Sequence, residues 1–387
     1  MRLPVSPSRY CRAATLTGVI LTSCVTVRTQ SSTKSNPSQT SQTERAGQPL
    51  ELGPSEVELR TGIALTSRGL FAEAIPHFLA AQGRVSDEYA ADFNLSLCYV
   101  ATGQYQQALA VLSQIASAGR ATAGVYNLLA QTFIGMSREQ DAIGAFQKGV
   151  ARDPKNERLY LLAADACIDH QSYELGLEFV DTGLQHLPRS ARLHYERGVL
   201  LSLVDQPDRA RGDLRLAREL AKGTSLSFLA DAQEGLLNGT MDQAIRAARD
   251  GLRKEPENYV LLTILGQALM RQGSGPGQPE FDGGRAALEK SVALRPNYAV
   301  SQLALGQMLL LEGHLSEAIT HLEKARELAP NDPSTYSRLA VAYRQRGDLQ
   351  EADKMLAVLT TLNKEQAAKY KLDPPDHKGS YLGSPKQ

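Results

Sequence analysis

The stretch GHLSEAITHLEKARELAPND, residues 313–332, decides the fold. Its apolar residues recur at spacings of three and four, which places them on one face of an α-helix. They are Leu315, Ala318, Ile319, Leu322, Ala325 and Leu328. Pro330 prevents the helix from continuing, and two turn-forming residues, Asn331 and Asp332, follow it. Ala318 is unusual because it holds a core-facing position with almost no side chain. If this smallness recurs at a fixed distance, it indicates a tight contact between helices.

Small residues recur along the chain in two columns. The first column is Ala74, Ala108, Ala142, Gly176, Ala210, Ala244, Gly284, Ala318 and Ala352. Seven of its eight intervals are 34 residues long, and the interval from Ala244 to Gly284 is 40. The second column lies twelve positions earlier, or eighteen in the copy of Gly284, and is Gly62, Ser96, Ala130, Ala164, Gly198, Ala232, Gly266, Gly306 and Ala340. Two small columns in nine copies predict a repeated helix pair whose axes cross closely at the small residues.

A 34-residue period of helix–turn–helix units resembles the tetratricopeptide repeat. The third copy carries the family pattern as Tyr126, Leu129, Ala130, Phe133, Ala142, Phe146 and Pro154. The terminal proline recurs as Pro154, Pro188, Pro256, Pro296 and Pro330, while the chain contains no Trp. The resemblance covers roughly residues 55–365. It implies an all-α, right-handed superhelical solenoid of about nine repeats, because one helix pair cannot bury its apolar face alone.

Composition divides the chain into four segments. Residues 1–24 have the form of a signal peptide, and residues 25–54 form a Ser-, Thr- and Gln-rich segment that we expect to be a flexible linker. The solenoid is expected at 55–370, and the Pro- and Gly-rich tail, 371–387, is expected to be disordered. An insertion at 272–284 lengthens the turn inside the seventh repeat by six residues. Either a tolerated surface loop or a binding loop is consistent with it.

The first residues indicate export. Arg2, Arg9 and Arg12 precede an apolar run, 13–21, that is too short to cross a bilayer. The sequence Leu-Thr-Ser-Cys that ends at Cys24 resembles the bacterial lipobox, in which the cysteine becomes the first residue and is acylated. This resemblance implies an envelope lipoprotein, located in the periplasm and lipid-anchored to a membrane through Cys24. The alternatives are an ordinary cleaved signal and a disordered leader without a tether.

No motif in the chain indicates catalysis. The patterns G-x-S-x-G, H-E-x-x-H and G-x-x-x-x-G-K-[ST] are absent. Lys+Arg and Asp+Glu are equal at 42 each, which argues against a nucleic-acid-binding protein. Cys98 and Cys167 lie two repeats apart and are expected to be buried thiols, and the seven His show no metal-ligand spacing. We therefore expect no enzyme, cofactor, metal ion or small-molecule substrate.

The family resemblance implies a concave groove lined by the fifth and ninth positions of the first helix in each repeat. Neither column contains Lys or Arg, so a charge clamp for a partner's carboxyl terminus is not expected. The candidate groove residues are Phe93, Asn127, Gln131, Tyr195, Gln233, Gln267 and Gln307. The amides would bond the backbone of an extended peptide, and the aromatic rings would anchor it. Alternatively, the glutamines are simply good helix formers on a wet face.

These features predict a scaffold that binds a protein or peptide partner, is exported and membrane-tethered, and assists assembly of an envelope complex. A second hypothesis is a partner or targeting subunit of an envelope enzyme such as a glycosyltransferase or peptidase. A third, weaker hypothesis is that the chain is itself an enzyme that uses the inserted loop at 272–284.

Overall fold

The computed structural model describes residues 53–372, and its regular structure in this range consists of eighteen α-helices without a strand. The helices are α1 (Pro54–Ser67), α2 (Phe71–Ala81), α3 (Glu88–Ala101), α4 (Tyr105–Ser117), α5 (Ala123–Gly135), α6 (Glu139–Arg152), α7 (Glu157–Asp169), α8 (Tyr173–His186), α9 (Ala191–Leu203), α10 (Pro207–Leu220), α11 (Ser225–Asn238), α12 (Met241–Lys254), α13 (Tyr259–Arg271), α14 (Pro279–Leu294), α15 (Ala299–Glu312), α16 (Leu315–Leu328), α17 (Pro333–Arg346) and α18 (Leu349–Leu372). The predicted all-α class is confirmed.

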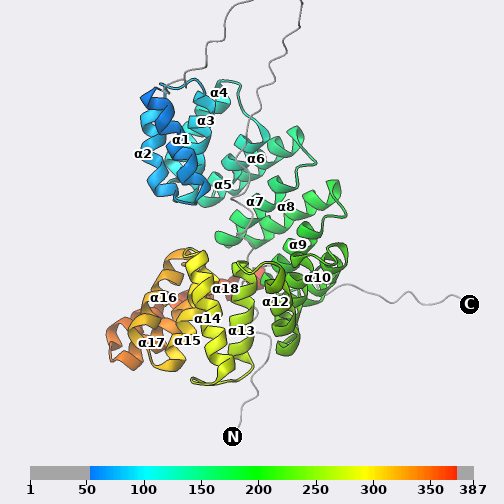
Figure 1. The fold of residues 1–387 in the computed structure, drawn as a ribbon, viewed down its shortest axis with the longest axis vertical. Helices are drawn as coiled ribbons and strands as arrows, with labels where there is room; N and C mark the ends of the chain where they lie inside the picture. Colours follow the sequence, from blue (N-terminus) through cyan, green and yellow to red (C-terminus); the bar gives the residue numbers. More distant parts are fainter. Residues whose placement is uncertain (1–52, 373–387) are drawn as a thin grey trace, which may run out of the picture. The chain divides into compact units, whose positions relative to one another are not determined.

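The helices form two compact units, which divide between Leu220 and Ala221. The first unit contains α1 to α10 and the second contains α11 to α18. Within each unit every odd-numbered helix packs against the even-numbered helix that follows it, and the helices succeed one another in chain order (Figure 1). Nine such pairs match the nine predicted repeats. The sequence analysis treated the repeats as one array, because the spacing of small residues continues across the division without a change.

The two small columns lie at the contact between the helices of a pair, as predicted. All eighteen residues of the columns are buried. A Cβ atom built on Gly198 of α9 would lie 2.9 Å from Leu214 Cγ and 3.2 Å from the Ala210 carbonyl oxygen of α10. The same arrangement recurs at Gly306, where a Cβ would lie 2.7 Å from Leu322 Cγ. At the four glycines of the first-helix column, Gly62, Gly198, Gly266 and Gly306, a large side chain from one turn further along the second helix fills the space of the missing Cβ.

The turns inside the pairs share a backbone feature that the sequence analysis did not identify. At one equivalent place in every turn the residue has a positive φ, between 57° and 98°: Gly69, Gly103, Ser137, Gln171, Asp205, Gly239, Gly273, Gly313 and Gly347; the longer turn of the seventh pair adds Gly277. A left-handed residue at this place ends the first helix and redirects the chain into the second. These nine positions follow the repeat spacing. The pattern is hard to see in the sequence because Ser, Gln and Asp replace glycine in three consecutive copies.

The terminal prolines hold the connections between successive pairs. Each of the five proline carbonyls lies within hydrogen-bond distance of a side-chain nitrogen or hydroxyl group. In four copies the partner is the fourth residue of the next helix: Tyr160 to Pro154, His194 to Pro188, Gln302 to Pro296 and Tyr336 to Pro330. In the fifth, Lys290 of α14 donates to Pro256 at 2.9 Å. These bonds satisfy carbonyls that no helix can satisfy.

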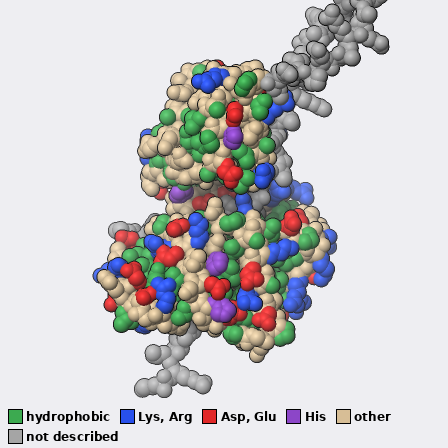
Figure 2. All heavy atoms as spheres, turned by 60° about the vertical axis from the view of Figure 1, so that its left-hand side comes forward, with side chains coloured by type: hydrophobic (Ala, Val, Ile, Leu, Met, Phe, Trp, Pro, Cys, Tyr) green, Lys and Arg blue, Asp and Glu red, His purple; other side chains and the backbone are tan. Residues whose placement is uncertain are grey.

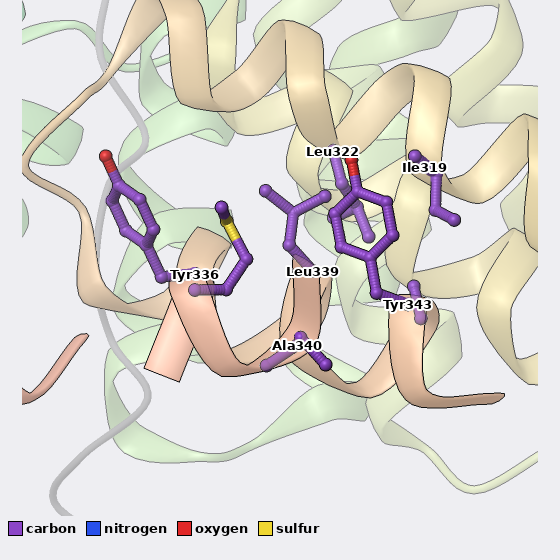
Figure 3. Packing of buried hydrophobic residues seen from close by; sticks show 9 residues of the cluster. Ile319, Leu322, Tyr336, Leu339, Ala340 and Tyr343 are labelled. Carbon is purple, nitrogen blue, oxygen red and sulfur yellow. The ribbon is translucent and has the colours of Figure 1, made fainter. Parts of the chain in front are cut away.

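The last two pairs illustrate the core of the second unit. Leu339, Ala340 and Tyr343 of α17 pack against Leu322 and Ile319 of α16 (Figure 3). The hydroxyl of Tyr336 points away from these aliphatic side chains (Figure 3), toward the carbonyl of Pro330, to which it donates at 2.7 Å. Partly buried leucines of α18 cover the same cluster: Leu356, Leu359 and Leu362. Helix α18 thus closes the apolar face of the last repeat and extends to Leu372.

The inserted segment of the seventh repeat is only partly a loop. Helix α13 ends at Arg271 and α14 begins at Pro279, so residues 272–278 form the turn and 279–284 are helical. The sequence analysis assigned all of 272–284 to the lengthened turn. Pro279, however, lies at the start of α14, where the missing N–H costs nothing. Phe281 then anchors the added turn, since its side chain is fully buried.

Candidate functional site

Phe93 of α3 is the candidate aromatic anchor that remains partly open. Its side chain is half-buried, and its ring stacks on that of Tyr89 with 5.8 Å between the centroids. The Tyr89 hydroxyl lies 2.9 Å from Thr122 Oγ1, at the start of the next pair. The stack therefore holds the Phe93 ring in place, and the side chain stays half-buried.

Asn127 and Gln131 of α5 form a hydrogen-bonded pair. Gln131 donates to Asn127 Oδ1 at 2.5 Å, and Asn127 Nδ2 donates to the Leu159 carbonyl of α7 at 2.7 Å. Asn127 is buried at 4% exposure, whereas Gln131 is half-buried. Asn127 is therefore occupied in joining successive repeats. Gln131 is the member of the pair that a partner can reach.

Tyr195 and Gln233 do not present open side chains in the structure. Their exposures are 0% and 4%, and these two predictions need correction in that respect. Tyr195 belongs to α9, and most residues of this helix are buried. The fifth position of α9 therefore does not lie on a solvent-exposed face. Gln233 lies in a buried stretch of α11, and its Oε1 accepts no hydrogen bond within the part of the chain that the structure describes.

Gln267 of α13 and Gln307 of α15 are half-buried. Over residues 53–372 neither side chain makes a hydrogen bond, so their amides are free to bond an added chain. With Phe93 and Gln131 in the first unit, they are the candidate residues that the structure leaves accessible. The groove itself stays a prediction.

A set of carboxyl groups on α7 and α9 was missed by the sequence analysis. Asp165 and Asp169 are one helical turn apart on α7, and Glu196 lies on α9, which packs against α7. Glu196 is buried at 1% exposure, and its Oε1 has no hydrogen-bond partner within residues 53–372. Burial, together with the nearby charge of Asp169, raises the pKa of Glu196 to about 8. A glutamate within the apolar run LHYERGVLL is the sequence signal that could have revealed it.

Asp169 also lies near a second polar contact. The Tyr105 hydroxyl of α4 is 2.9 Å from Nε2 of His170, the residue after Asp169. Burial and the charge of Asp169 raise the pKa of Tyr105, and burial lowers the pKa of His170. Both groups are therefore uncharged at neutral pH, so neither brings a positive charge to the carboxyl groups.

An ion-pair network stabilises the same unit beside this set. Arg197 donates to both oxygens of Asp213, at 2.7 and 2.8 Å, and to Asp181 at 2.8 Å. His194 lies 2.8 Å from Asp213 through Nδ1 and 3.1 Å from the Pro188 carbonyl through Nε2. The bonds to Asp213 and Asp181 raise the pKa of Arg197. This network joins α8, α9 and α10, and its cation is fully engaged.

The cysteines of the repeats are packed thiols. Cys98 and Cys167 are both buried and free. Burial raises the pKa of Cys98 to about 11 and also raises that of Cys167, so neither is a reactive thiolate at neutral pH. Among the described residues, no group of three His, Cys, Asp or Glu side chains has an arrangement that could hold a metal ion.

The described helices include none that is both long enough and apolar enough to cross a bilayer. The predicted lipidation site, Cys24, lies outside the described residues, as do the predicted signal peptide, most of the linker and most of the tail. Figure 2 shows basic and acidic side chains side by side over much of the face it draws, with Lys and Arg side chains gathered along the right-hand edge of its lower part.

Family models match parts of this chain to known repeats. A tetratricopeptide repeat model matches residues 65–132 and 309–372, and a second matches residues 277–333. The chain therefore contains tetratricopeptide repeats in both units. The search of curated proteins found no match.

Three solved structures are similar to this chain. A chain of the APC/C hetero-tetramer Cut9–Hcn1 is 14% identical over 82% of this chain and 66% of its own, with a TM-score of 0.49. The human IFIT1 dimer with PPP-AAAA is 14% identical over 81% of this chain and 92% of its own, with a TM-score of 0.42. A tetratricopeptide repeat protein from Parabacteroides merdae is 16% identical over 74% of this chain and 98% of its own, with a TM-score of 0.43. This chain thus spans about two thirds of the length of the first of these proteins.

Proposed function

We propose that these tetratricopeptide repeats form a non-enzymatic scaffold that binds a protein or peptide partner along the first helices of the repeats. Proteins with such repeats generally act as interaction scaffolds. The observation that carries the proposal is the accessibility of Phe93, Gln131, Gln267 and Gln307, at two equivalent positions of their repeats. The amides of Gln267 and Gln307, on the first helices of two successive repeats of the second unit, suit the backbone of an extended segment, and the Phe93 ring offers an apolar anchor in the first unit.

Photo-crosslinking in cells tests this proposal directly. A photoreactive residue at Gln131 is expected to capture a defined protein, because that side chain lies on the half-buried face of α5. The matched control is Gln147, which is exposed on the second helix of the same pair, α6. Mass spectrometry then identifies the captured protein. Capture of the same proteins from both positions, in equal amounts, would show that the first-helix face has no special role.

We also propose that the scaffold is exported and held on a membrane through acylated Cys24, where it assists assembly of an envelope complex. Support comes from the basic start, the short apolar run and the Leu-Thr-Ser-Cys sequence. Wild type is expected to partition into detergent and to incorporate labelled palmitate, and Cys24→Ser is expected to do neither. Equal labelling of both proteins would refute the anchor. A glycosyltransferase or peptidase as the crosslinked partner would favour the role of enzyme subunit instead.

A further inference from the structure

Helix α12 of the second unit carries a row of three arginines on its outer face. Arg246, Arg249 and Arg253 are all exposed, and their spacings of three and four residues place them within about 60° of one another around the helix. At a rise of about 1.5 Å per residue, this arginine row is about 10 Å long. Like charges one turn apart destabilise a helix, so the formation of α12 does not itself call for such a row.

The arginine row belongs to one repeat and not to the repeat pattern. Its residues lie two, five and nine positions after Ala244, the small residue of their helix. At the same three positions in each of the other eight copies, the only cations are Arg215 and Lys354. The sixth repeat therefore presents a concentrated positive charge where its neighbours present small, polar or acidic side chains.

Two of the three guanidinium groups have no partner in the part of the chain that the structure describes. Arg253 donates to Asp250, three residues before it. Arg246 and Arg249 make no side-chain hydrogen bond or ion pair within residues 53–372. Asp242, one turn before Arg246, accepts a hydrogen bond from Gln272 Nε2 at 2.8 Å. Arg246 and Arg249 are therefore open to anionic groups from outside the chain.

The surroundings of the arginine row favour a narrow anionic occupant. Asp250 borders the row on α12 itself. On α14, the next second helix along the chain, the equivalent positions hold Ala286, Glu289 and Ala293, and Glu289 is exposed. A bilayer or a nucleic acid is broad, so its phosphates would meet these carboxyl groups as well as the arginines. A single segment of polypeptide can follow the row alone.

We propose that the arginine row of α12 is a docking surface for an acidic segment of a protein partner. A guanidinium group bonds a carboxylate through two parallel N–H groups, which makes it well suited to Asp and Glu side chains. In an extended segment, every second side chain points to the same side, about 6.6 Å from the next. Three alternate carboxylates therefore extend over about the length of the row. This surface lies on a second helix, so it goes beyond the scaffold proposal, which uses the first helices.

Fluorescence anisotropy with the full-length chain tests this surface. The first probe is Ala-Glu-Ala-Glu-Ala-Glu-Ala-amide, the second has Gln in place of each Glu, and both carry the same dye at the amino terminus. Wild type is expected to bind the glutamate peptide at least fivefold more tightly at low salt. Added salt should reduce this preference, because exposed charge pairs are screened. In the double variant Arg246→Gln with Arg249→Gln, the preference is expected to fall below twofold.

The matched control is Lys354→Gln with Lys364→Gln. It removes the same charge from exposed positions on α18, another second helix of the second unit, and should keep the wild-type preference. Equal loss of preference in the two double variants would show attraction by overall charge alone and would overturn the surface. Equal binding of both peptides by wild type would also overturn it, and that comparison does not depend on the folding of any variant.

The two broad occupants are tested with vesicles of phosphatidylcholine and phosphatidylglycerol and with oligothymidylate. Wild type and the double variant of Arg246 and Arg249 are expected to bind each of these probes alike. If the arginines strengthen binding to vesicles or to oligothymidylate as much as to the glutamate peptide, an acidic segment is not the occupant and the proposal fails. Crosslinking at Gln131 judges the scaffold proposal separately.

Discussion

At the scale of single residues, the turns inside the helix pairs place a strict demand on one backbone position. Nine residues there have positive φ, and Ser137, Gln171 and Asp205 meet the demand without being glycine. A left-handed conformation costs an L-residue about 1–2 kcal/mol, because Cβ approaches the carbonyl oxygen. Three consecutive repeats therefore carry strain that the other six avoid.

Reciprocal substitutions at this position are expected to change stability in opposite directions. Gly103→Ser should lower the free energy of unfolding by about 1 kcal/mol, since φ is +73° there. Ser137→Gly should raise it by a few tenths, because relief of strain slightly exceeds the added entropy of the unfolded chain. Urea unfolding followed by circular dichroism measures both. The same sign for both variants would contradict the assigned turn.

The buried carboxyl group of Glu196 makes stability depend on pH. Its pKa is raised from 4.5 to about 8 in the folded state, so the folded state binds more protons than the unfolded state between these values. The contribution of the protonated Glu196 to the free energy of unfolding is fully present below pH 4.5 and is lost as the pH rises toward about 8. The only charged side chain identified as acting on Glu196 within the described residues is Asp169.

Urea unfolding at pH 5, 6, 7 and 8 is expected to show this dependence. Wild type should lose up to about 1.4 kcal/mol of unfolding free energy per pH unit relative to Glu196→Gln, which has no carboxyl group to titrate. The unfolding free energy of wild type should therefore rise relative to that of Glu196→Gln as the pH falls. Parallel curves for the two proteins would mean that the Glu196 pKa is not raised.

At the scale of helices, the small columns were predicted because repetition makes a weak signal strong. Gly198 alone says nothing, but nine small residues at one spacing require a common cause. The structure supplies it, since Leu214 and the Ala210 carbonyl occupy the space of a Cβ. The exposure of Tyr195 could not be predicted in this way. Burial depends on what covers a whole helix, which the pattern within one repeat does not encode.

The same limit of a single-repeat pattern explains why the sequence analysis missed the carboxyl groups on α7 and α9. Asp165 and Asp169 are an ordinary pair of helix carboxyl groups in the sequence. Only packing of α9 against α7 brings Glu196 to them and removes it from water. Asn127 was predicted to face a partner, yet it is buried and its amide donates to the Leu159 carbonyl of the next repeat. Contacts between repeats were beyond the reach of a single-repeat pattern.

Two glycines of one helix pair offer a matched test of the close contact. A Cβ at Gly198 meets Leu214 and backbone, whereas one at Gly212 of α10 meets nothing within 4 Å. Gly198→Ala should therefore lower the free energy of unfolding by about 1–2 kcal/mol, since overpacking outweighs the gain in helix propensity. Gly212→Ala should raise it by up to about 1 kcal/mol. Chemical unfolding of both variants checks this, and stabilisation by Gly198→Ala would place the crossing elsewhere.

At the scale of the whole molecule, the helix pairs of each unit contact their neighbours along the chain and little else. Stability in such an array is approximately a sum of local terms. A change in one unit is therefore expected to stay there, and hydrogen exchange read by mass spectrometry can resolve it helix by helix.

Gly198→Ala should speed amide exchange in α9 and α10 and leave α15 and α16 as in wild type. Gly306→Ala is the counterpart in the second unit, where a Cβ would lie 2.7 Å from Leu322 Cγ, and it should give the reverse pattern. Each variant serves as the control for the other. Equal acceleration in both units by either variant would show that the chain opens as one cooperative body.

The single 40-residue interval has a consequence for how such a gene can change length. Its six additional residues lie between Gly266 and Leu288, yet these two residues still make the same close contact as in the other copies. Residues inserted in that turn therefore leave the helix contacts on either side of it unchanged. Duplication of a whole period would add a helix pair that packs on its neighbours through the same contacts that the existing pairs make. Lineages can therefore lengthen or shorten this chain by whole periods, and only changes that cut across these contacts need compensation elsewhere.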